Sequence, residues 1–340
     1  MKILFIVPPY YTTDVLTAPL YPMPYGTVCV ATAFKAAGHD VRVLDLLALP
    51  GACKGAPVQA PPAFQGLGAP PYFRFGPSPE EVSAIIKREG ANADVFGVTS
   101  GPCNVWEGPH SVIDAIRKHF PGKRIMMGGS FATAAPQDAL HLLAPDVVFV
   151  GEGEAAPEYT ELLDDQHGYY VTQCLEAKPD LISPDWSVLS LGLKAYPRVN
   201  GKMRGVISTS RGCPHGCEFC AVPVGFPGPM RFKKPARIIE EMKQLWYQGV
   251  RYFTFLDDNL LCSPGRAEDI FGVIRYLRRS IPRFANTSTT FYNEEGLEVR
   301  MAAQPGLVEE MKMLGFTNIG IGLETLNEEA RQGMKKPYTS

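Results

Sequence analysis

The sequence predicts two successive α/β domains: an N-terminal doubly wound parallel sheet and, after a linker, a second domain of repeated strand-then-helix units. Short apolar runs alternate with segments of helical periodicity along most of the chain, as they do in parallel sheets with crossover helices. A proline-containing stretch at residues 166–200 interrupts this alternation and predicts the linker. We therefore expect the two domains at residues 1–165 and 201–340.

The N-terminal domain is expected to contain five strands joined by crossover segments. Glycines follow the last three of these strands, at the end where open parallel sheets bind ligands. Residues 50–77 are rich in Pro, Gly and Ala, which predicts a long loop with little regular structure. Helices are expected at residues 26–37, 79–88 and 110–120. The expected strands are Lys2–Val7, Val41–Asp45, Asp94–Ser100, Arg124–Gly129 and Asp146–Gly151.

The C-terminal domain is expected to repeat a strand-then-helix unit, with one helix closed by Gly249 and another by Gly315. The basic stretch at residues 223–235 predicts a flexible, exposed loop. Helices are expected at residues 235–248, 265–279 and 305–314. The expected strands are Val206–Ser210, Tyr252–Leu256, Arg283–Thr290 and Asn318–Leu323.

Composition limits the possible classes of protein. The chain has 340 residues, enough for two hydrophobic cores, and its net charge of −2 gives no indication of a nucleic-acid or membrane-surface protein. No apolar run is long enough to span a bilayer, and the run at residues 1–7 ends at Pro8 without a signal-peptide cleavage site. We therefore expect a cytoplasmic protein, in a compartment that keeps thiols reduced.

The most informative stretch is the loop expected after the first strand of the C-terminal domain. It carries Cys213, Cys217 and Cys220, and thiolates are ligands for iron–sulfur clusters or zinc. Three thiolates can hold three corners of a [4Fe–4S] cluster and leave the fourth iron open to a small molecule. A structural zinc site is the alternative, but it needs a fourth ligand such as Cys262.

With Phe219 before the last cysteine, this C-x3-C-x2-C motif resembles that of radical S-adenosylmethionine (SAM) enzymes. The resemblance implies a [4Fe–4S] cluster that cleaves bound SAM reductively and produces a 5′-deoxyadenosyl radical. It also implies an external electron donor of the flavodoxin or ferredoxin type. The resemblance further implies that the C-terminal domain is a partial (β/α) barrel. The family's barrel has six units, so we expect a truncated chain that lacks the last two units and any substrate-specific C-terminal domain.

The same resemblance suggests which polar residues contact SAM. Asp257, Asp258 and Asn259 follow the second strand of the barrel, where the family holds the amino group of SAM. A carboxylate suits an ammonium group, although Asp258 or Asn259 could instead cap the following helix. Asn286 and Ser288, at the expected end of the third strand, are candidates for the carboxylate or ribose, and Glu324 matches a position near the ribose.

Short motifs recur in a fixed order along the N-terminal half, among them Pro8-Pro9-Tyr10, Gly128-Gly129-Ser130 and Gly151-Glu-Gly-Glu154. Their order resembles that of the cobalamin-binding domain that precedes many radical SAM domains. Cobalamin domains of the methionine-synthase type carry an Asp-x-His-x-x-Gly motif, whose His binds cobalt from below. This motif is absent from the sequence, so we expect cobalamin without an axial histidine ligand. The alternative is a degenerate Rossmann-like domain without a cofactor. The implied cobalamin contacts are Pro9, Tyr10, Ser100, Gly128, Gly129, Ser130, Gly151, Glu152 and Gly153.

Together these resemblances predict a cobalamin-dependent radical SAM enzyme, most simply a methyltransferase acting on an unactivated carbon. The expected substrate is a small or natural-product-like molecule, with no nucleic-acid partner and no membrane span. A cyclase or ring-rearranging enzyme is one alternative. A non-catalytic fragment that binds metal or cobalamin is another.

Overall fold

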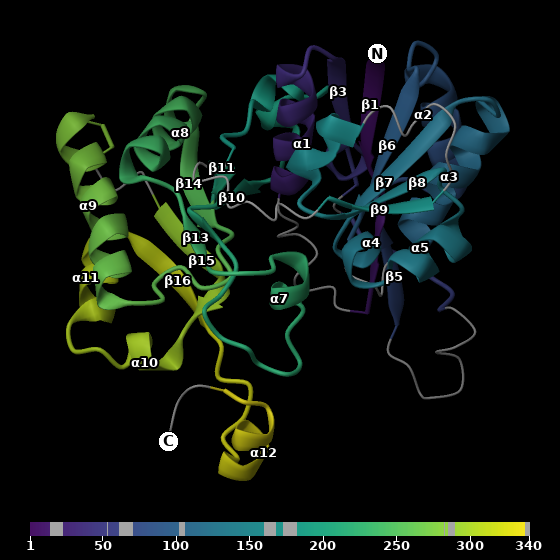
Figure 1. Ribbon diagram of the computed structural model, residues 1–340. Coiled ribbons are helices and arrows are strands. Elements are labelled where there is room, and N and C mark those ends of the chain that lie inside the picture. Colours follow the sequence, from purple (N-terminus) through teal and green to yellow (C-terminus); the bar gives the residue numbers. More distant parts are fainter. Residues whose placement is uncertain are drawn as a thin grey trace. The chain divides into compact units, whose positions relative to one another are not determined.

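The computed structural model describes residues 1–13, 23–52, 54–60, 71–101, 106–159, 168–172, 182–281, 283–284 and 290–336. The chain divides into two compact units, which are coloured purple to teal and teal to yellow in Figure 1. The first comprises Met1–Cys174 and Pro184–Pro197, and the second Leu175–Ser183 and Arg198–Ser340. The domain boundaries at residues 165 and 201 stay predictions.

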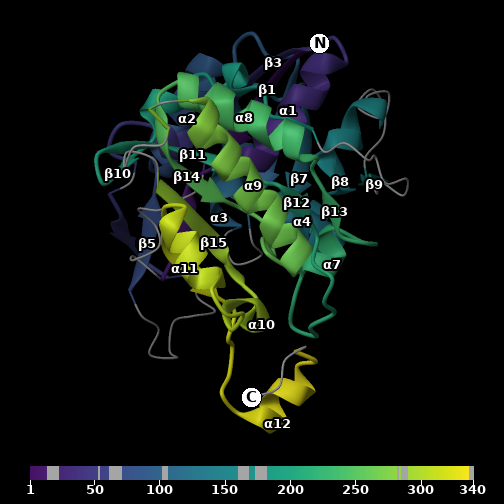
Figure 2. The same ribbon diagram turned by 90° about the vertical axis from the view of Figure 1, so that its left-hand side faces the viewer.

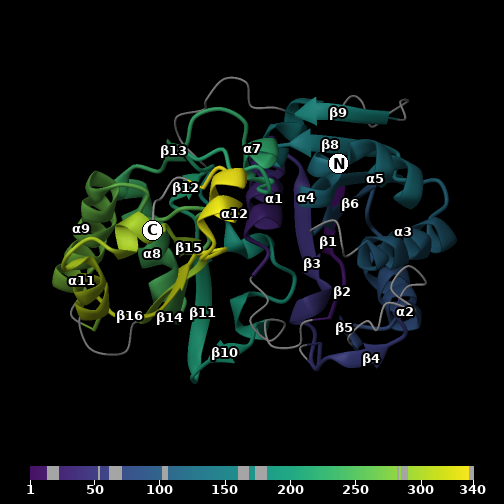
Figure 3. The same ribbon diagram turned by 90° about the horizontal axis from the view of Figure 1, so that it is seen from below.

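The first unit is built on a parallel sheet, which confirms the doubly wound prediction. Its order, over the residues that are described, is β3-β1-β6-β7-β8-β9. Each of the five predicted strands is present within a residue of its expected bounds, and β9 extends the sheet beside β8 from within the predicted linker (Figure 3). The strands are β1 (Lys2–Val7), β3 (Asp40–Asp45), β6 (Val95–Ser100), β7 (Arg124–Gly129), β8 (Val147–Gly151) and β9 (Gly168–Thr172).

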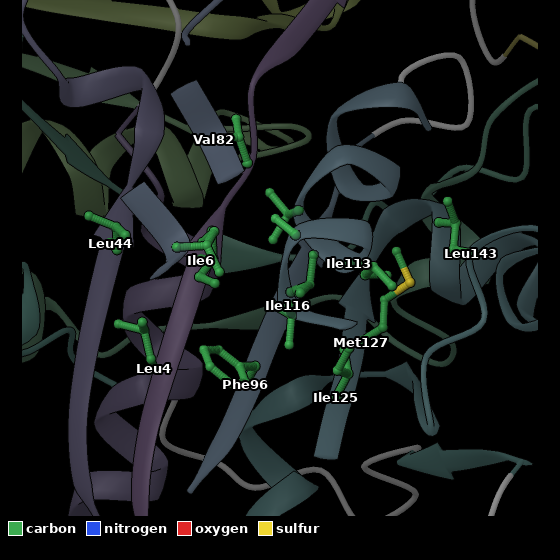
Figure 4. Close-up of a cluster of buried hydrophobic side chains, with 14 of the residues drawn as sticks. Leu4, Ile6, Leu44, Val82, Phe96, Ile113, Ile116, Ile125, Met127 and Leu143 are labelled. Carbon is green, nitrogen blue, oxygen red and sulfur yellow. The ribbon is translucent and has the colours of Figure 1, made fainter. Parts of the chain in front are cut away.

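Helices cover both faces of this sheet because its central strands are apolar on both sides. In β1, Leu4 and Ile6 join the core cluster that α2, α3 and α5 complete (Figure 4). Phe5 points to the other face, where its ring meets Phe34 of α1 with centroids 5.5 Å apart. The helices are α1 (Tyr25–Ala36), α2 (Pro79–Glu89), α3 (Glu107–His119), α4 (Ser130–Ala134) and α5 (Pro136–Leu143), with 3₁₀ turns η2 (Leu46–Ala48), η4 (Gly153–Tyr159), η5 (Trp186–Val188) and η6 (Leu193–Ala195).

A small antiparallel sheet follows β1, in the order β2-β5-β4 among the described residues. It consists of β2 (Tyr10–Thr12), β4 (Ala56–Val58) and β5 (Tyr72–Phe75). The prediction that residues 50–77 have little regular structure was therefore wrong at β4 and β5, while residues 53 and 61–70 lie outside the described part. Composition suggested a loop because these strands are short and gain their stability from pairing, β5 with β2 and β4 with β5.

The second unit contains the partial barrel, whose described strands run in the order β10-β11-β14-β15-β16. The β11, β14, β15 and β16 strands are parallel, and β10 is antiparallel to β11. Figure 2 shows α8, α9 and α11 in front of the strands. The barrel strands are β10 (Arg198–Val199), β11 (Lys202–Ile207), β14 (Val250–Phe255), β15 (Thr290–Leu297) and β16 (Phe316–Ile321).

The remaining elements of the second unit include a ribbon in which Ser210 and Arg211 pair with Phe232 and Arg231. These elements are β12 (Ser210–Arg211), β13 (Arg231–Phe232), α7 (Val222–Gly225), α8 (Pro235–Tyr247), α9 (Pro264–Ser280), α10 (Val299–Ala302), α11 (Leu307–Met313) and α12 (Glu328–Gly333). The ribbon corrects the expectation of a flexible loop at 223–235. Lys233 is buried there, and its Nζ lies 2.7 and 2.9 Å from the carboxylate oxygens of Glu241.

The third strand of the barrel was predicted about one strand length too early. The strand runs from Thr290 to Leu297 instead of from Arg283 to Thr290. Arg283 and Phe284 lie in a turn, and residues 285–289 lie outside the described part. The β-branched and aromatic residues at 287–291 drew the prediction toward the start of the strand.

In the described part of the chain, no helix is long and apolar enough to cross a membrane.

Candidate cluster and cofactor sites

The approach to the cysteine motif is fixed by a buried polar network at the carboxyl ends of β11 and β14. Asp257 is 0 % exposed and accepts hydrogen bonds from the Thr209 amide (2.9 Å), the Thr209 hydroxyl (2.7 Å) and the Ser210 hydroxyl. Arg266 donates to the Thr209 carbonyl at 2.8 Å. Burial raises the pKa of Asp257, and these donors oppose that shift. The carboxylate therefore anchors the chain that enters the motif, and its predicted contact with SAM stays a prediction.

The next two residues contact the motif itself, which we call the cluster loop (residues 212–220). The Gly212 amide donates to Asp258 Oδ2 at 3.2 Å. The side-chain Nδ2 of Asn259 donates to Cys213 Sγ at 3.8 Å. Neither side chain caps the following helix, because Ser263 Oγ accepts from Arg266 N at the start of α9. The capping alternative for Asp258 and Asn259 was therefore wrong.

The thiols of Cys213, Cys217 and Cys220 are all partly buried in this loop. Burial raises the pKa of the Cys213 and Cys217 thiols, so a positively charged partner is needed to hold them as thiolates. Among the described residues, no three His, Cys, Asp or Glu side chains are grouped closely enough for a single metal ion. In an iron–sulfur cluster each thiolate binds a different iron, so the donor set fits such a cluster.

A residue that the sequence analysis missed supports the cluster loop from β15. His215 Nε2 lies 2.7 Å from Glu298 Oε2, just after the carboxyl end of that strand. Burial disfavours the charged form of Glu298, but hydrogen bonds from Arg300 and His215 outweigh burial and lower its pKa. Glu298 was missed because the strand was predicted to end at Thr290; a correct strand end would have revealed it.

Glu324 lies near the far end of the cluster loop. Its Oε1 is 3.1 Å from Lys336 Nζ, which also donates to the Gly322 carbonyl at 3.2 Å. The same ammonium lies 5.4 Å from the ring centroid of Phe219, within cation–π range. Glu324 thus joins the neighbourhood of the cluster loop. Asn286 and Ser288 lie outside the described residues, and their contact with SAM stays a prediction.

In the first unit, the predicted cobalamin contacts follow successive strands of the sheet. Ser100 ends β6, where its hydroxyl donates to the Gly128 carbonyl at 2.8 Å and accepts from Ala132 N at 3.0 Å. Gly129 has a φ of +108°, and a Cβ there would lie 2.2 Å from the Ser100 carbonyl oxygen. At Gly128, by contrast, the nearest atom of the described residues to an added Cβ would be the Phe149 carbonyl oxygen, at 3.8 Å. The backbone at Gly128 is therefore open to a close approach by a large ligand.

The other predicted contacts lie around the same edge. Ser130 begins α4, and Gly151 ends β8, where its amide donates to Thr133 Oγ1 at 3.1 Å. Glu152 is buried, and a Cβ at Gly153 would lie 2.8 Å from Val30 Cγ2, so both positions pack inside the unit. Pro9 and Tyr10 lead from β1 into β2, beside the same carboxyl edge. This edge of backbone and small residues fits a large planar cofactor, although each individual contact stays a prediction.

Two family descriptions cover most of the chain. Residues 11–159 match the B12 binding domain, and residues 207–340 match the Radical SAM superfamily. The chain belongs to the cobalamin-binding radical SAM family. Membership establishes the predicted cofactors, namely a [4Fe–4S] cluster, SAM and cobalamin, in place of the zinc and cofactor-free alternatives.

The chain is similar to curated members and to a solved structure. It is 29% identical to an uncharacterized methyltransferase (sll1242) of Synechocystis sp., over 63% of this chain and 38% of that protein. It is 27% identical to the anaerobic magnesium-protoporphyrin IX monomethyl ester cyclase of Synechocystis sp., over 76% of this chain and 50% of the relative. The chain therefore spans half or less of the length of these two relatives.

The fold also matches a known structure. The radical SAM methyltransferase TsrM from Kitasatospora setae, solved with cobalamin and a [4Fe–4S] cluster bound, aligns with a TM-score of 0.65 at 15% identity. The alignment covers 98% of this chain and 61% of TsrM. At this identity the likeness supports the fold of this family member.

Proposed function

We propose that the chain forms part of a cobalamin-dependent radical SAM methyltransferase acting on an unactivated carbon of a small or natural-product-like substrate. The observation that carries the proposal is the C-x3-C-x2-C loop, held from β14 and β15, in one chain with a B12 binding domain. When bound, the cluster supplies one-electron reduction of SAM and cobalamin supplies methyl transfer.

The protein's own residues hold and orient these groups. Cys213, Cys217 and Cys220 bind the cluster, and the Asp257 network fixes the chain that leads into the cluster loop. Glu324 offers a carboxylate beside the cluster loop for the ribose hydroxyls of SAM. In the first unit, the backbone at Gly128 and its neighbours accommodates the corrin ring without a bulky side chain.

The assignment of the ligands is tested with a matched pair of variants, Cys217→Ala and Cys262→Ala. Anaerobically reconstituted wild-type protein should hold about four irons per chain and convert SAM to 5′-deoxyadenosine under reducing conditions. Cys217→Ala should abolish that conversion. Cys262 is a partly buried free thiol outside the motif. Cys262→Ala should therefore retain its iron and still convert SAM to 5′-deoxyadenosine. Persistent cleavage in Cys217→Ala would show that the ligand assignment is wrong.

A cyclase is the second candidate, because the chain is 27% identical to a curated cyclase over 76% of its length. The two reactions consume SAM differently. A methyltransferase of this kind yields both S-adenosylhomocysteine and 5′-deoxyadenosine, since SAM is its methyl donor as well as its radical source. A cyclase yields 5′-deoxyadenosine without S-adenosylhomocysteine, and a non-catalytic fragment yields neither. Chromatography of the products from full-length protein distinguishes the three.

We also propose that the protein works in the cytoplasm with a flavodoxin- or ferredoxin-type electron donor and without a nucleic-acid partner. Reduced thiols in that compartment suit the cluster loop, and a net charge of −2 does not suit a polyanion. Replacing chemical reductant with reduced flavodoxin should sustain SAM cleavage. Retention of the protein on RNA at moderate salt would contradict the last part of the proposal.

A further inference from the structure

Three consecutive side chains of the β14–α9 turn contact the chain around the cluster loop in sequence order. Asp257 binds Thr209 and Ser210, Asp258 accepts from the Gly212 amide, and Asn259 donates to Cys213. The Asn259 contact is the one that reaches a predicted cluster ligand.

The side chain of Asn259 is held firmly in place. It is 4 % exposed and is followed by Leu260 and Leu261, which are both fully buried. Its amide has two ends with different environments. Nδ2 lies 3.8 Å from Cys213 Sγ, whereas Oδ1 is buried and has no hydrogen-bond partner in the described part of the protein.

A hydrogen bond to a ligand sulfur changes the electronic state of a cluster. The bond withdraws negative charge from the sulfur and therefore favours the reduced form, which carries one more electron. Asp258 acts in the opposite direction, because its carboxylate accepts from the Gly212 amide and so places a negative charge beside the residue that precedes Cys213. A second donor, the His215 backbone amide, also faces Cys213. Asn259 is thus a neutral side-chain donor facing the first thiolate beside a competing carboxylate.

We propose that Asn259 is a positioning residue that raises the reduction potential of the cluster through its N–H···S bond to Cys213. The inference rests on the cluster of the proposed function. The electron comes from the reductant used in the titration, and the cluster is the group reduced.

The test is a redox titration of the reconstituted full chain, without SAM, followed by electron paramagnetic resonance. Asn259→Asp retains an acceptor oxygen of the same shape but loses the N–H donor. Asn259→Leu loses both groups at similar volume. Both variants should titrate at a more negative potential than the wild type. The matched control is Ser263→Ala, which weakens the α9 cap at the end of the same turn without touching Cys213 and should titrate like the wild type.

Iron content and the visible spectrum separate this inference from the proposed function, because they report whether a cluster is present at all. Unchanged potentials in both variants at full iron content would overturn the role of Asn259. A second measurement needs no variant. In wild-type protein labelled with ¹⁵N-asparagine, the reduced cluster should show a ¹⁵N hyperfine coupling, and its absence would equally overturn the inference.

Discussion

The predicted cofactor sites of the two units both lie at the carboxyl edge of a parallel sheet, but the two edges consist of different chemical groups. In the first unit the edge consists of backbone and small residues, such as Gly128 and Gly129 after β7. In the second unit the edge consists of thiols and a buried polar network around Asp257. A large planar cofactor needs room along the backbone, whereas an inorganic cluster needs specific ligands held in fixed positions. Substitutions in one unit should therefore affect its own site and leave the site of the other unit unchanged.

The largest effect is expected at Asp257, where the second unit depends on one buried carboxylate. Asp257→Ala leaves the Thr209 and Ser210 donors without an acceptor and should lower the free energy of unfolding by about 3–5 kcal/mol. Hydrogen exchange of the full chain should show faster exchange in the second unit and unchanged exchange in the first.

The control for this prediction is Asp269→Ala. Asp269 is 3.8 Å from the same Arg266, but its side chain is 53% exposed, so its loss should cost less than about 1 kcal/mol. Equal effects of the two substitutions would contradict the central place given to the buried network.

The corresponding test of the first unit uses two neighbouring glycines. Gly129→Ala forces a φ of +108° on alanine and puts Cβ 2.2 Å from a carbonyl oxygen, so it should cost about 3 kcal/mol. Gly128→Ala should fold normally because its Cβ meets nothing closer than 3.8 Å. If the corrin ring approaches Gly128, that variant should nevertheless bind hydroxocobalamin more weakly. Normal cobalamin affinity in Gly128→Ala would remove this glycine from the proposed contacts.

The first unit also contains a buried carboxylate, and its protonation should make the stability of this unit depend on pH. Burial raises the pKa of Asp45 from 3.8 to about 6, while hydrogen bonds from Tyr196 and the Leu47 amide oppose the shift. Between these values the folded state binds more protons than the unfolded state, so stability should fall as the pH rises from 4 to 6. The loss should reach about 3 kcal/mol.

Asp45→Asn should remove most of this slope, because an amide keeps an oxygen for Leu47 and has no charge. Urea unfolding at a series of pH values measures the effect, with the exposed Asp40→Asn on the same strand as the control. If the dependence of stability on pH persists in Asp45→Asn, another titratable group causes it.

The smallest effect is expected at the surface of the first unit. Lys35 Nζ lies 2.7 Å from Asp185, but both side chains are more than a third exposed. Lys35→Ala should change the free energy of unfolding by about 0.5 kcal/mol at low salt and less in 1 M salt. A larger change in the free energy of unfolding would contradict the expectation that exposed ion pairs contribute little to the stability of this unit.

The sequence predicts the parallel strands well where their apolar runs are continuous. The β1 and β8 strands are examples, since burial on both faces leaves a plain signal in the residue types. The cysteine motif is equally readable because its chemistry is contained in one short loop. In contrast, β15 contains Asn293, Glu294 and Glu295, which are unusual in a strand of a parallel sheet, so the prediction moved to the threonine-rich stretch before it.

Contacts between residues far apart in the chain were not predictable in the same way. The burial of Lys233 against Glu241 depends on the β12–β13 ribbon, and the contact of His215 with Glu298 depends on where β15 ends. Asp257 was expected to contact SAM because it follows the second barrel strand, where the resembled family holds the amino group of SAM. Its use as an internal anchor follows from the positions of Thr209 and Ser210, 48 and 47 residues earlier.

The turn between β14 and α9 has a consequence for how this protein can vary. Loops generally tolerate insertions, but here residues 257, 258 and 259 each have a separate partner in the opposing chain. One additional residue ahead of this turn would shift each of these side chains by one position, so that the two carboxylates and the amide would no longer face their partners. The length of this connection is therefore a tighter constraint than the identity of any single residue in it.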